Sequence, residues 1–588
     1  MEYDKDLFWY EQETQDAMAA SLVSHVNTLI DKTNHREMMI RHYRLYSNRQ
    51  FISFLPNEHY KNNSEERLTL NVVKSCVDTA AAKIAKSKPR PQFLGQKGMW
   101  NTKKQMQQLQ QFIDGIFYQE NCYEKGRKMF VDSAISGDGY FKVMAKKERV
   151  CVERTLPFEI IVDESDAVDG NPSIIYQVKY VNKRKLAAMF KDKKIKKLIS
   201  EASFEKEFYT YTGKTTDMVL VVEAWRLPSA EGAKDGTHCL AIAEGMLTHS
   251  TYERDYFPFV KFGYYPKSFG YYSQGIAESL TGIQIEINRI LKTIQVAMYL
   301  GSVPKIFVDV NTKIVKAHLN NEIGGIITYQ GIKPTYDQLM KVPPDLFMQL
   351  QNLYDKAYQQ EGLTQMSATG AKPAGLDSGK ALRTYNAIET DRFSLVAQRY
   401  DDAFVELADL IIKVCEYEAE KGNFIKTTSL GTKYIEPISW DKIRISREYY
   451  VLRTFPTNFL SQTPEARLED IQELLGMGLL SPEQAKMLLE YPDLDAVMEF
   501  ENAALNDIHL TLDAIIERGE YNPPLPQQNL QYGIRLMQYS YLKFRHENMP
   551  TDKLEKMLMW ADEAIKLVAK MTPQPQQPAN ITTAPIQL

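Results

Sequence analysis

Hydrophobic residues follow a helical period of three or four over most of the first 135 positions. A helix that starts near Asn71 should end before Pro89 and Pro91, because proline fixes φ and restricts the residue before it. The period changes at Gly137 and Gly139, two breakers that precede alternating or continuously apolar segments. We interpret these segments as mainly antiparallel strands: 140–144, 159–162, 174–180 and 218–225.

Two long helices dominate the pattern of the second half. Residues 274–300 carry apolar side chains at steps of three and four beside a second, polar stripe, which predicts an amphipathic helix of about 40 Å. Residues 378–421 keep the same alternation over about 65 Å, far beyond an average helix. A compact monomer offers little surface for burying such a helix, so the pattern indicates packing against further copies of the chain.

A short α/β insert and a loop lie between these two helices. We expect strands at 305–308 and 325–329 with a helical stretch near 312–318 between them. A proline-started helix then covers 344–362, and the loop 363–377 leads into the long helix.

The C-terminal part is predicted to be helical over residues 461–570. Thr463 and Ser481 are each followed by proline, which is typical of a helix cap and first helical position. The tail 571–588 holds four prolines, four glutamines and no aromatic residue, so we expect it to be disordered. The predicted fold class is α+β, mainly helical.

Composition excludes some classes of protein. The 588 residues include 71 Lys and Arg against 75 Asp and Glu, a net charge of -4, which excludes a basic coat over the whole surface. No apolar run reaches the roughly 18 residues of a membrane span, and the acidic N-terminus is unlike a signal peptide. Five widely spaced cysteines indicate free thiols in a reducing compartment.

No set of residues with catalytic or metal-binding spacing is found. Gly375, Gly379 and Lys380 are similar to a phosphate-binding loop, but the glycines are four positions apart and Ala381 stands where Ser or Thr would hold magnesium. The nine histidines form no HxxxH or HExxH pair. We therefore expect no catalytic residues, no metal and no cofactor.

Two basic runs leave two interpretations open, nucleic-acid contact or ordinary charged helix surface. One combines residues 183–185 with 191–197, and the other covers residues 83–90.

Several motifs occur in an order that resembles a known family. They are Asn71-Val-Val, 77–79, 88–91, 130–143, 157–163, 221–225, 257–260, 275–280 leading into 284–288, and 378–381. The last two blocks are the most specific. The chain resembles the portal protein, or head-to-tail connector, of tailed double-stranded DNA bacteriophages, especially those of short-tailed phages.

The resemblance implies a portal fold with wing, stem, clip and crown, assembled as a ring around a central channel. The implied regions are an α+β wing (1–273), a stem helix (274–300), a clip (301–343), a second stem helix (344–362), a tunnel loop (363–377), a long wing helix with a return to the wing (378–460), a helical crown (461–570) and a disordered tail (571–588).

The implied function is a channel at one capsid vertex through which double-stranded DNA is packaged and ejected. The expected partners are further copies of the chain, usually twelve in a ring, double-stranded DNA, the terminase large subunit, the major capsid protein, the scaffolding protein and tail adaptor proteins, with no membrane. The expected location is the virion, after assembly in the host cytoplasm. Portals are not enzymes, since a separate terminase hydrolyses ATP.

Two groups of candidate site residues follow from the resemblance. DNA-facing side chains are expected in the nearly uncharged tunnel loop, at Met366, Ser367, Thr369 and Lys372, unless the loop is disordered and these side chains are incidental. The polar face of the first stem helix is expected at Glu278, Gln284, Asn288 and Lys292. The alternatives are a helical scaffold or adaptor without a channel, and a cytoplasmic enzyme with an unrecognised site.

Overall fold

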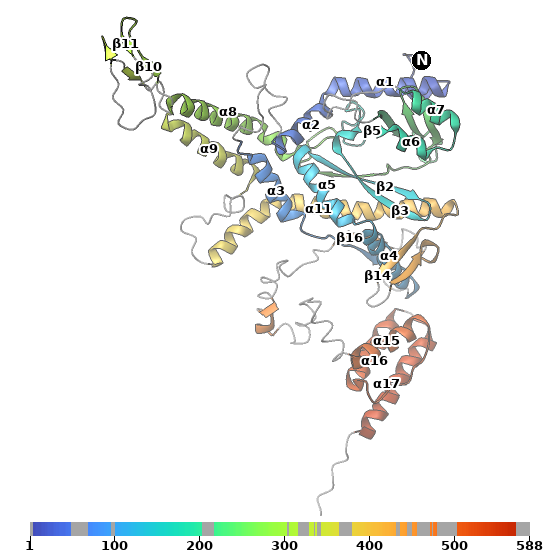
Figure 1. Cartoon of the computed structure of the whole chain (residues 1–588). Helices are drawn as coiled ribbons and strands as arrows, with labels where there is room; N and C mark the ends of the chain where they lie inside the picture. Colours follow the sequence, from blue (N-terminus) through green and yellow to red (C-terminus); the bar gives the residue numbers. More distant parts are fainter. Residues whose placement is uncertain are drawn as a thin grey trace, which may run out of the picture. The chain divides into compact units, whose positions relative to one another are not determined.

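Helices and strands alternate along the chain, with helices predominating, which confirms the α+β class (Figure 1). The computed structural model describes residues 4–48, 69–95, 100–202, 217–302, 305–314, 329–333, 335–337, 343–363, 379–430, 435–443, 450–454, 471–472, 474–478, 503–547 and 549–571. The chain forms two compact units. The first comprises Met1–Lys88 and Ile116–Ile425, and the second Pro89–Gly115 and Lys426–Leu588.

The first unit contains an antiparallel five-stranded sheet. Its strands, in spatial order, are β4 (Ile160–Ile161), β5 (Ile174–Asn182), β6 (Met218–Arg226), β7 (Thr237–Ile242) and β8 (Gly245–Thr251). Successive side chains of a strand point to opposite faces. On β6, Leu220 and Val222 therefore pack with α1 (Gln15–Thr33). Val219 and Val221 pack with the helices α6 (Lys183–Met189) and α7 (Lys193–Glu201). Helices thus cover both faces of the sheet (Figure 1).

A second, three-stranded sheet has the order β3 (Arg149–Thr155), β2 (Asp138–Lys146), β9 (Phe259–Gly263). The helix α5 (Cys122–Ser136) turns into β2 at Gly137, whose φ of 106° favours glycine. The expected helix, glycine turn and strand are confirmed. The helix α11 (Gly379–Glu420) packs on this sheet, and the centre of its Tyr400 ring lies 5.8 Å from that of Phe262 on β9.

A buried charged group connects the two sheets. Lys142 on β2 donates to Glu223 Oε2 on β6 at 2.6 Å and to Gln177 Oε1 on β5 at 2.8 Å. Its ammonium also lies 4.5 Å from the centre of the Trp225 ring. Burial lowers the pKa of Lys142, and Glu223 opposes that shift. Removing Glu223 would leave the buried Lys142 ammonium without its ion-pair partner, whereas Glu223 also has His238 Nε2 at 3.0 Å from its Oε1. The pair therefore stabilises the contact between the two sheets.

Two antiparallel helices project from the first unit (Figure 1). They are α8 (Ile276–Ser302) and α9 (Pro344–Glu361), close to the predicted bounds. Beyond them lie two small pairs of strands, β10 (Lys305–Phe307) with β13 (Thr335–Asp337), and β11 (Lys313–Ile314) with β12 (Tyr329–Gln330). The prediction of a helix near 312–318 is wrong at 313–314. There the backbone groups pair with those of β12 and form a strand. Residues 315–318 lie outside the described part.

The core of the first unit also includes η1 (Trp9–Glu11), α2 (His35–Tyr46), α3 (Val72–Ile84) and η4 (Pro157–Glu159). The helices α2, α3 and α5 all contact α8, so they form the base from which α8 projects. The helix near Asn71 does end before Pro89, as the proline pair predicts.

The second unit combines short antiparallel pairs and helices. Its strands are β1 (Pro91–Gly95) paired with β16 (Tyr450–Thr454), and β14 (Lys426–Leu430) paired with β15 (Ile435–Ser439). Its helices include most of α4 (Trp100–Gln119), η6 (Trp440–Lys442) and a bundle of α15 (Ala503–Glu517), α16 (Leu530–His546) and α17 (Thr551–Met571). Trp560, Met537 and Ile508 fill the centre of the bundle. Of the helical region expected at 461–570, residues 461–470 and 479–502 lie outside the described residues.

Candidate functional site at the base of the paired helices

The chain enters α8 through a close backbone crossing. A Cβ on Gly275 would lie 2.6 Å from the Gly137 nitrogen and 2.7 Å from the Ile135 carbonyl oxygen, so only glycine fits. Next to it, the Ser273 amide donates to the buried Asp138 carboxylate at 3.0 Å. The start of α8 is therefore fixed against the turn between α5 and β2.

Lys261 completes this buried junction. Its ammonium lies 3.4 Å from Asp138 Oδ1 and donates to the Tyr271 carbonyl. Burial lowers the pKa of Lys261, and the Asp138 carboxylate opposes that shift. The carboxylate thus carries both a backbone amide and a cation, which satisfies a charge that burial alone would make costly.

About two and a half turns after Gly275, a buried amide on α8 holds the start of α3. Gln284 Oε1 accepts from the Val72 amide at 2.8 Å, and its Nε2 donates to the Leu70 carbonyl at 2.9 Å and to Asn288 Oδ1 at 3.1 Å. A helix start leaves four amides without partners inside the helix. Gln284 satisfies one of them across a separation of 212 residues.

Asn71 caps the same helix start from its own chain segment. Its Oδ1 accepts from the Lys74 amide at 2.9 Å, while its Nδ2 donates to the carbonyls of Leu45 at 2.9 Å and Tyr46 at 3.0 Å. The cap therefore joins the end of α2 to the start of α3. Two of the sequence blocks that carried the resemblance, at Asn71 and at Gln284, meet at this point.

The end of α9 returns to the start of α8. The Ser279 hydroxyl donates to the buried carboxylate of Glu361, and Gln360 Nε2 donates to the Ser279 carbonyl at 3.1 Å. Gly362, with φ of 72°, ends the helix. Burial raises the pKa of the Cys76 thiol, with Glu361 adding to the shift. Both ends of the projecting pair are thus fastened to one place in the core.

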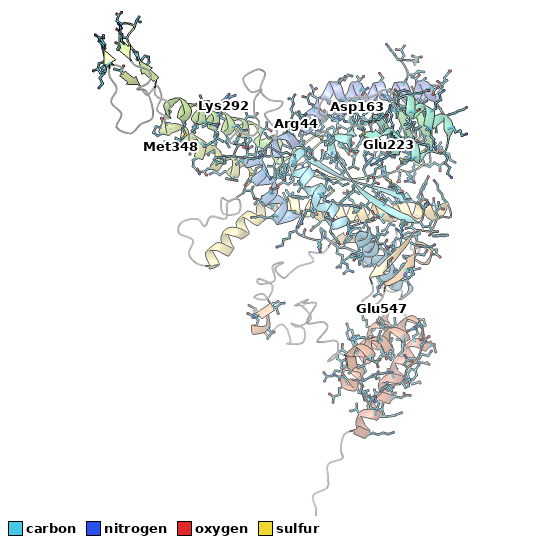
Figure 2. The ribbon with its side chains drawn as sticks, viewed as in Figure 1. Arg44, Asp163, Glu223, Lys292, Met348 and Glu547 are labelled. Carbon is cyan, nitrogen blue, oxygen red and sulfur yellow. The ribbon has the colours of Figure 1, made fainter. Side chains whose placement is uncertain are left out.

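The four predicted polar residues of α8 do not share one environment. Gln284 and Asn288 are buried at this joint. Glu278 forms a 3.5 Å ion pair with Lys267, and Lys292 is exposed further along the helix (Figure 2). The structure therefore brings Gln284 and Asn288 together, apart from the other two. The predicted tunnel-loop residues Met366, Ser367, Thr369 and Lys372 lie outside the described residues.

Exposed apolar side chains gather on the paired helices and the strand pairs beyond them, and the sequence analysis missed these. On α9, Phe347 and Met348 are 50% and 61% exposed (Figure 2). The other members are Val296, Met298, Phe307, Val308, Val310, Tyr329 and Ile332. The signal that could have revealed Phe347 and Met348 is their position outside the apolar register of α9. Such clustered exposure is typical of an interaction surface.

The described part of the chain contains no group of three His, Cys, Asp or Glu side chains placed to hold a metal ion. None of the helices examined there is long and apolar enough to span a membrane.

Comparison with known families decides how this arrangement is classified. The family model described as the phage SU10 portal protein matches residues 60–442. The chain belongs to this family of phage portal proteins. The portal match spans both sheets, the paired helices and α11, and ends before the bundle of α15, α16 and α17. No curated protein matches the chain. The resemblance to a bacteriophage portal is thus confirmed, while the short-tailed type stays a prediction.

Proposed function

We propose that the chain forms a ring, with twelve copies expected, at one capsid vertex, and that double-stranded DNA enters and leaves the capsid through its central channel. The membership in the portal family and the projecting helix pair support this proposal. A wall of a channel needs a rigid element that is anchored at one end and extends away from the body. The buried joint of Gly275, Gln284 and Glu361 supplies such an anchor.

The regions take their roles from this arrangement. In our proposal residues 1–273 and 378–460 form the wing, α8 and α9 the stem, 301–343 the clip, 363–377 the tunnel loop and 461–570 the crown. Phe347 on α9 and Val310 in the turn between β10 and β11 are examples of exposed apolar residues that suit contacts with neighbouring copies, the terminase large subunit or tail adaptors. The wing and crown would contact the major capsid and scaffolding proteins.

Electron microscopy of the purified chain, together with its mass in solution, tests the ring. Particles with a central hole and a mass near twelve times 67.7 kDa are expected. Filaments or small oligomers without a hole would support the alternative of a helical scaffold or adaptor. Hydrolysis of ATP by the pure chain would contradict a structural portal.

The tunnel loop is tested by reversing its one cation. Lys372→Glu should reduce the DNA packaged per capsid, because it reverses the charge proposed to contact phosphate. Asp377 is the one other ionisable side chain of the loop. Lys566→Glu, at an exposed position of α17, is the matched control and should package normally. Equal packaging and retention by both variants would remove Lys372 from the mechanism.

A further inference from the structure

The two short helices on the outer side of the five-stranded sheet carry an unusual concentration of positive charge. They are α6 (Lys183–Met189) and α7 (Lys193–Glu201). Residues 183–202 include eight Lys or Arg and two Asp or Glu, in a chain whose net charge is -4. This segment holds the basic run of residues 183–185 and 191–197, which the sequence leaves open between nucleic-acid contact and ordinary charged surface.

The packing of the two helices directs the cations outward. Leu186 and Ile199 are buried against Val219 and Val221 of the sheet. On α7, Lys193, Lys194, Lys196 and Lys197 occupy the side opposite the apolar stripe, and all four are exposed. Arg184, Lys185 and Lys191 are exposed as well. We call these seven residues the lysine face.

Lys183 differs from the lysine face because its ammonium is used within the fold. It is buried, donates to the Ala202 carbonyl at 2.6 Å and lies 3.2 Å from Asp217 Oδ1. It therefore ties the start of α6 to the end of α7 and is not part of the lysine face.

Little negative charge is available to the lysine face. Lys197 lies 3.7 Å from Glu201, and across the described part of the chain the other six cations have no carboxylate within ion-pair distance. Asp192 is already used as the cap of α7, accepting from the Lys194 amide at 2.8 Å. A surface lysine usually gains little from a pair, but six without one in so short a segment leave a strong local field.

The positions of these cations work against the helices that carry them. Lys193 and Lys194 stand in the first turn of α7, where the helix dipole favours negative charge. Lys193 and Lys197 are four residues apart on one face, a like-charge spacing that is unfavourable in a helix. An anionic partner bound to the lysine face would offset both of these unfavourable interactions.

The chemistry of the lysine face fits a phosphate backbone. Lysine is a compact point charge on a flexible stem, suited to phosphates without a fixed bidentate geometry. The described residues of α6 and α7 expose one large apolar side chain, Met189, and no aromatic ring apart from the half-buried Phe190. That surface lacks the apolar anchors of a membrane-binding helix and the aromatic anchors of a protein hot spot.

We propose that the lysine face binds the phosphate backbone of double-stranded nucleic acid without sequence preference. Within the first unit, α6 and α7 lie at the end remote from α8 and α9 (Figure 1). The contact is therefore separate from the channel proposed above and does not depend on it. It would act on DNA that lies alongside the protein outside the channel.

The test compares two variants of the full-length chain that change total charge equally. The first is Lys193→Gln with Lys194→Gln, Lys196→Gln and Lys197→Gln. The control places the same four changes at dispersed exposed positions, Lys128, Lys234, Lys566 and Lys570. Glutamine is a good helix former, and circular dichroism verifies that both variants keep their helix content.

Binding is measured by fluorescence anisotropy with a labelled duplex of random sequence, over about 50 to 200 mM salt. Each phosphate contact contributes about 0.9 to the slope of log affinity against log salt, so the clustered variant should lose up to about 3 to 4 from that slope. Its affinity at the lowest salt should fall at least about tenfold, and the dispersed control should stay within about twofold of the native chain.

Three outcomes would overturn the proposal. They are equal loss by both variants, no measurable binding of duplex by the native chain, and binding to vesicles of phosphatidylserine and phosphatidylcholine that depends on the four lysines while duplex binding does not. The assembly state of each variant is measured in parallel, and duplex binding is compared only between variants in the same state. A chain that does not form rings would therefore still test the lysine face.

Discussion

Two buried histidines on α2 should make the first unit sensitive to mild acid. His35 and His42 are 9% and 7% exposed, and the His35 ring centre lies 3.7 Å from that of Tyr272. Neither His35 Nε2 nor His42 Nδ1 has a hydrogen-bond partner in the described part of the chain. Burial, with a contribution from the Lys267 charge, lowers the pKa of His35 to about 3 and that of His42 to about 4.

The sign follows from proton uptake. Both pKa values lie below the unfolded value of about 6.5. Below that pH the unfolded chain therefore binds protons at these two histidines that the folded chain does not bind. The free energy of unfolding therefore has its full value above about pH 6.5 and decreases as the pH falls below it. At about pH 5 each histidine should remove about 2 kcal/mol from the free energy of unfolding, and the two together about 4 kcal/mol.

Urea unfolding at pH 7.5 and 5, with hydrogen exchange of α2 as a local probe, measures this loss. The double variant His35→Gln with His42→Gln should lose most of the pH dependence, whatever its stability at neutral pH. His509→Gln, at an exposed histidine that hydrogen-bonds Tyr532 at 3.0 Å, should retain it. Burial raises the pKa of Asp401 to about 6, an effect of opposite sign that is common to all three chains. An unchanged pH dependence in the double variant would refute the reasoning.

Three further predictions concern the joint and the link between the sheets. Gln284→Leu should cost about 2–4 kcal/mol in the free energy of unfolding, because it leaves the buried Val72 amide and the partly buried Leu70 carbonyl without this partner. The exposed Gln295→Leu should stay within about 0.5 kcal/mol. Gly275→Ala should prevent the joint from closing, whereas Gly282→Ala, with open space around it on the same helix, should stabilise by up to about 1 kcal/mol. Lys142→Met should cost about 2–3 kcal/mol, because it removes the cation from Glu223 Oε2 and the donor from Gln177 Oε1, while His238 Nε2 stays 3.0 Å from Glu223 Oε1.

Thermal and urea unfolding measure the stability of these five variants, and electron microscopy shows whether the two glycine variants still assemble. Equal stability of Gln284→Leu and Gln295→Leu would contradict the role given to the buried amide. Normal assembly and stability of Gly275→Ala would mean that the backbone crossing can widen at little cost. A Lys142→Met chain as stable as the native one would show that the carboxylate finds water or another partner.

Local signals made much of the fold predictable. Gly137 marks the turn from α5 into β2 because its positive φ excludes other residues, and that requirement is visible in the sequence itself. The long helices α8 and α11 follow from a period of three and four that persists over many turns. The strands β5 and β6 follow in the same way from short apolar runs rich in β-branched residues.

The joint could be predicted only in part, since its contacts are not local. Gln284 and Asn288 form a polar stripe in the sequence, which indicates solvent or a channel, yet they are buried because α3 brings unpartnered backbone groups to them. The residues around Gln284 in the sequence do not indicate that its partner lies 212 residues away. The short strand at Lys313–Ile314 was missed for a similar reason, since its pairing with Tyr329–Gln330 outweighs a weak local preference for helix.

The contact between Ser279 and Glu361 has a consequence for how such chains can change. The chain leaves the core at the start of α8 and comes back to nearly the same point at the end of α9. The region between behaves as an insertion whose two ends are already joined, so its length adds only a slowly growing loop-closure cost. The outer part of this region can therefore be lengthened, shortened or exchanged while the core keeps its packing, which lets the surface offered to partners vary independently of the body that carries it.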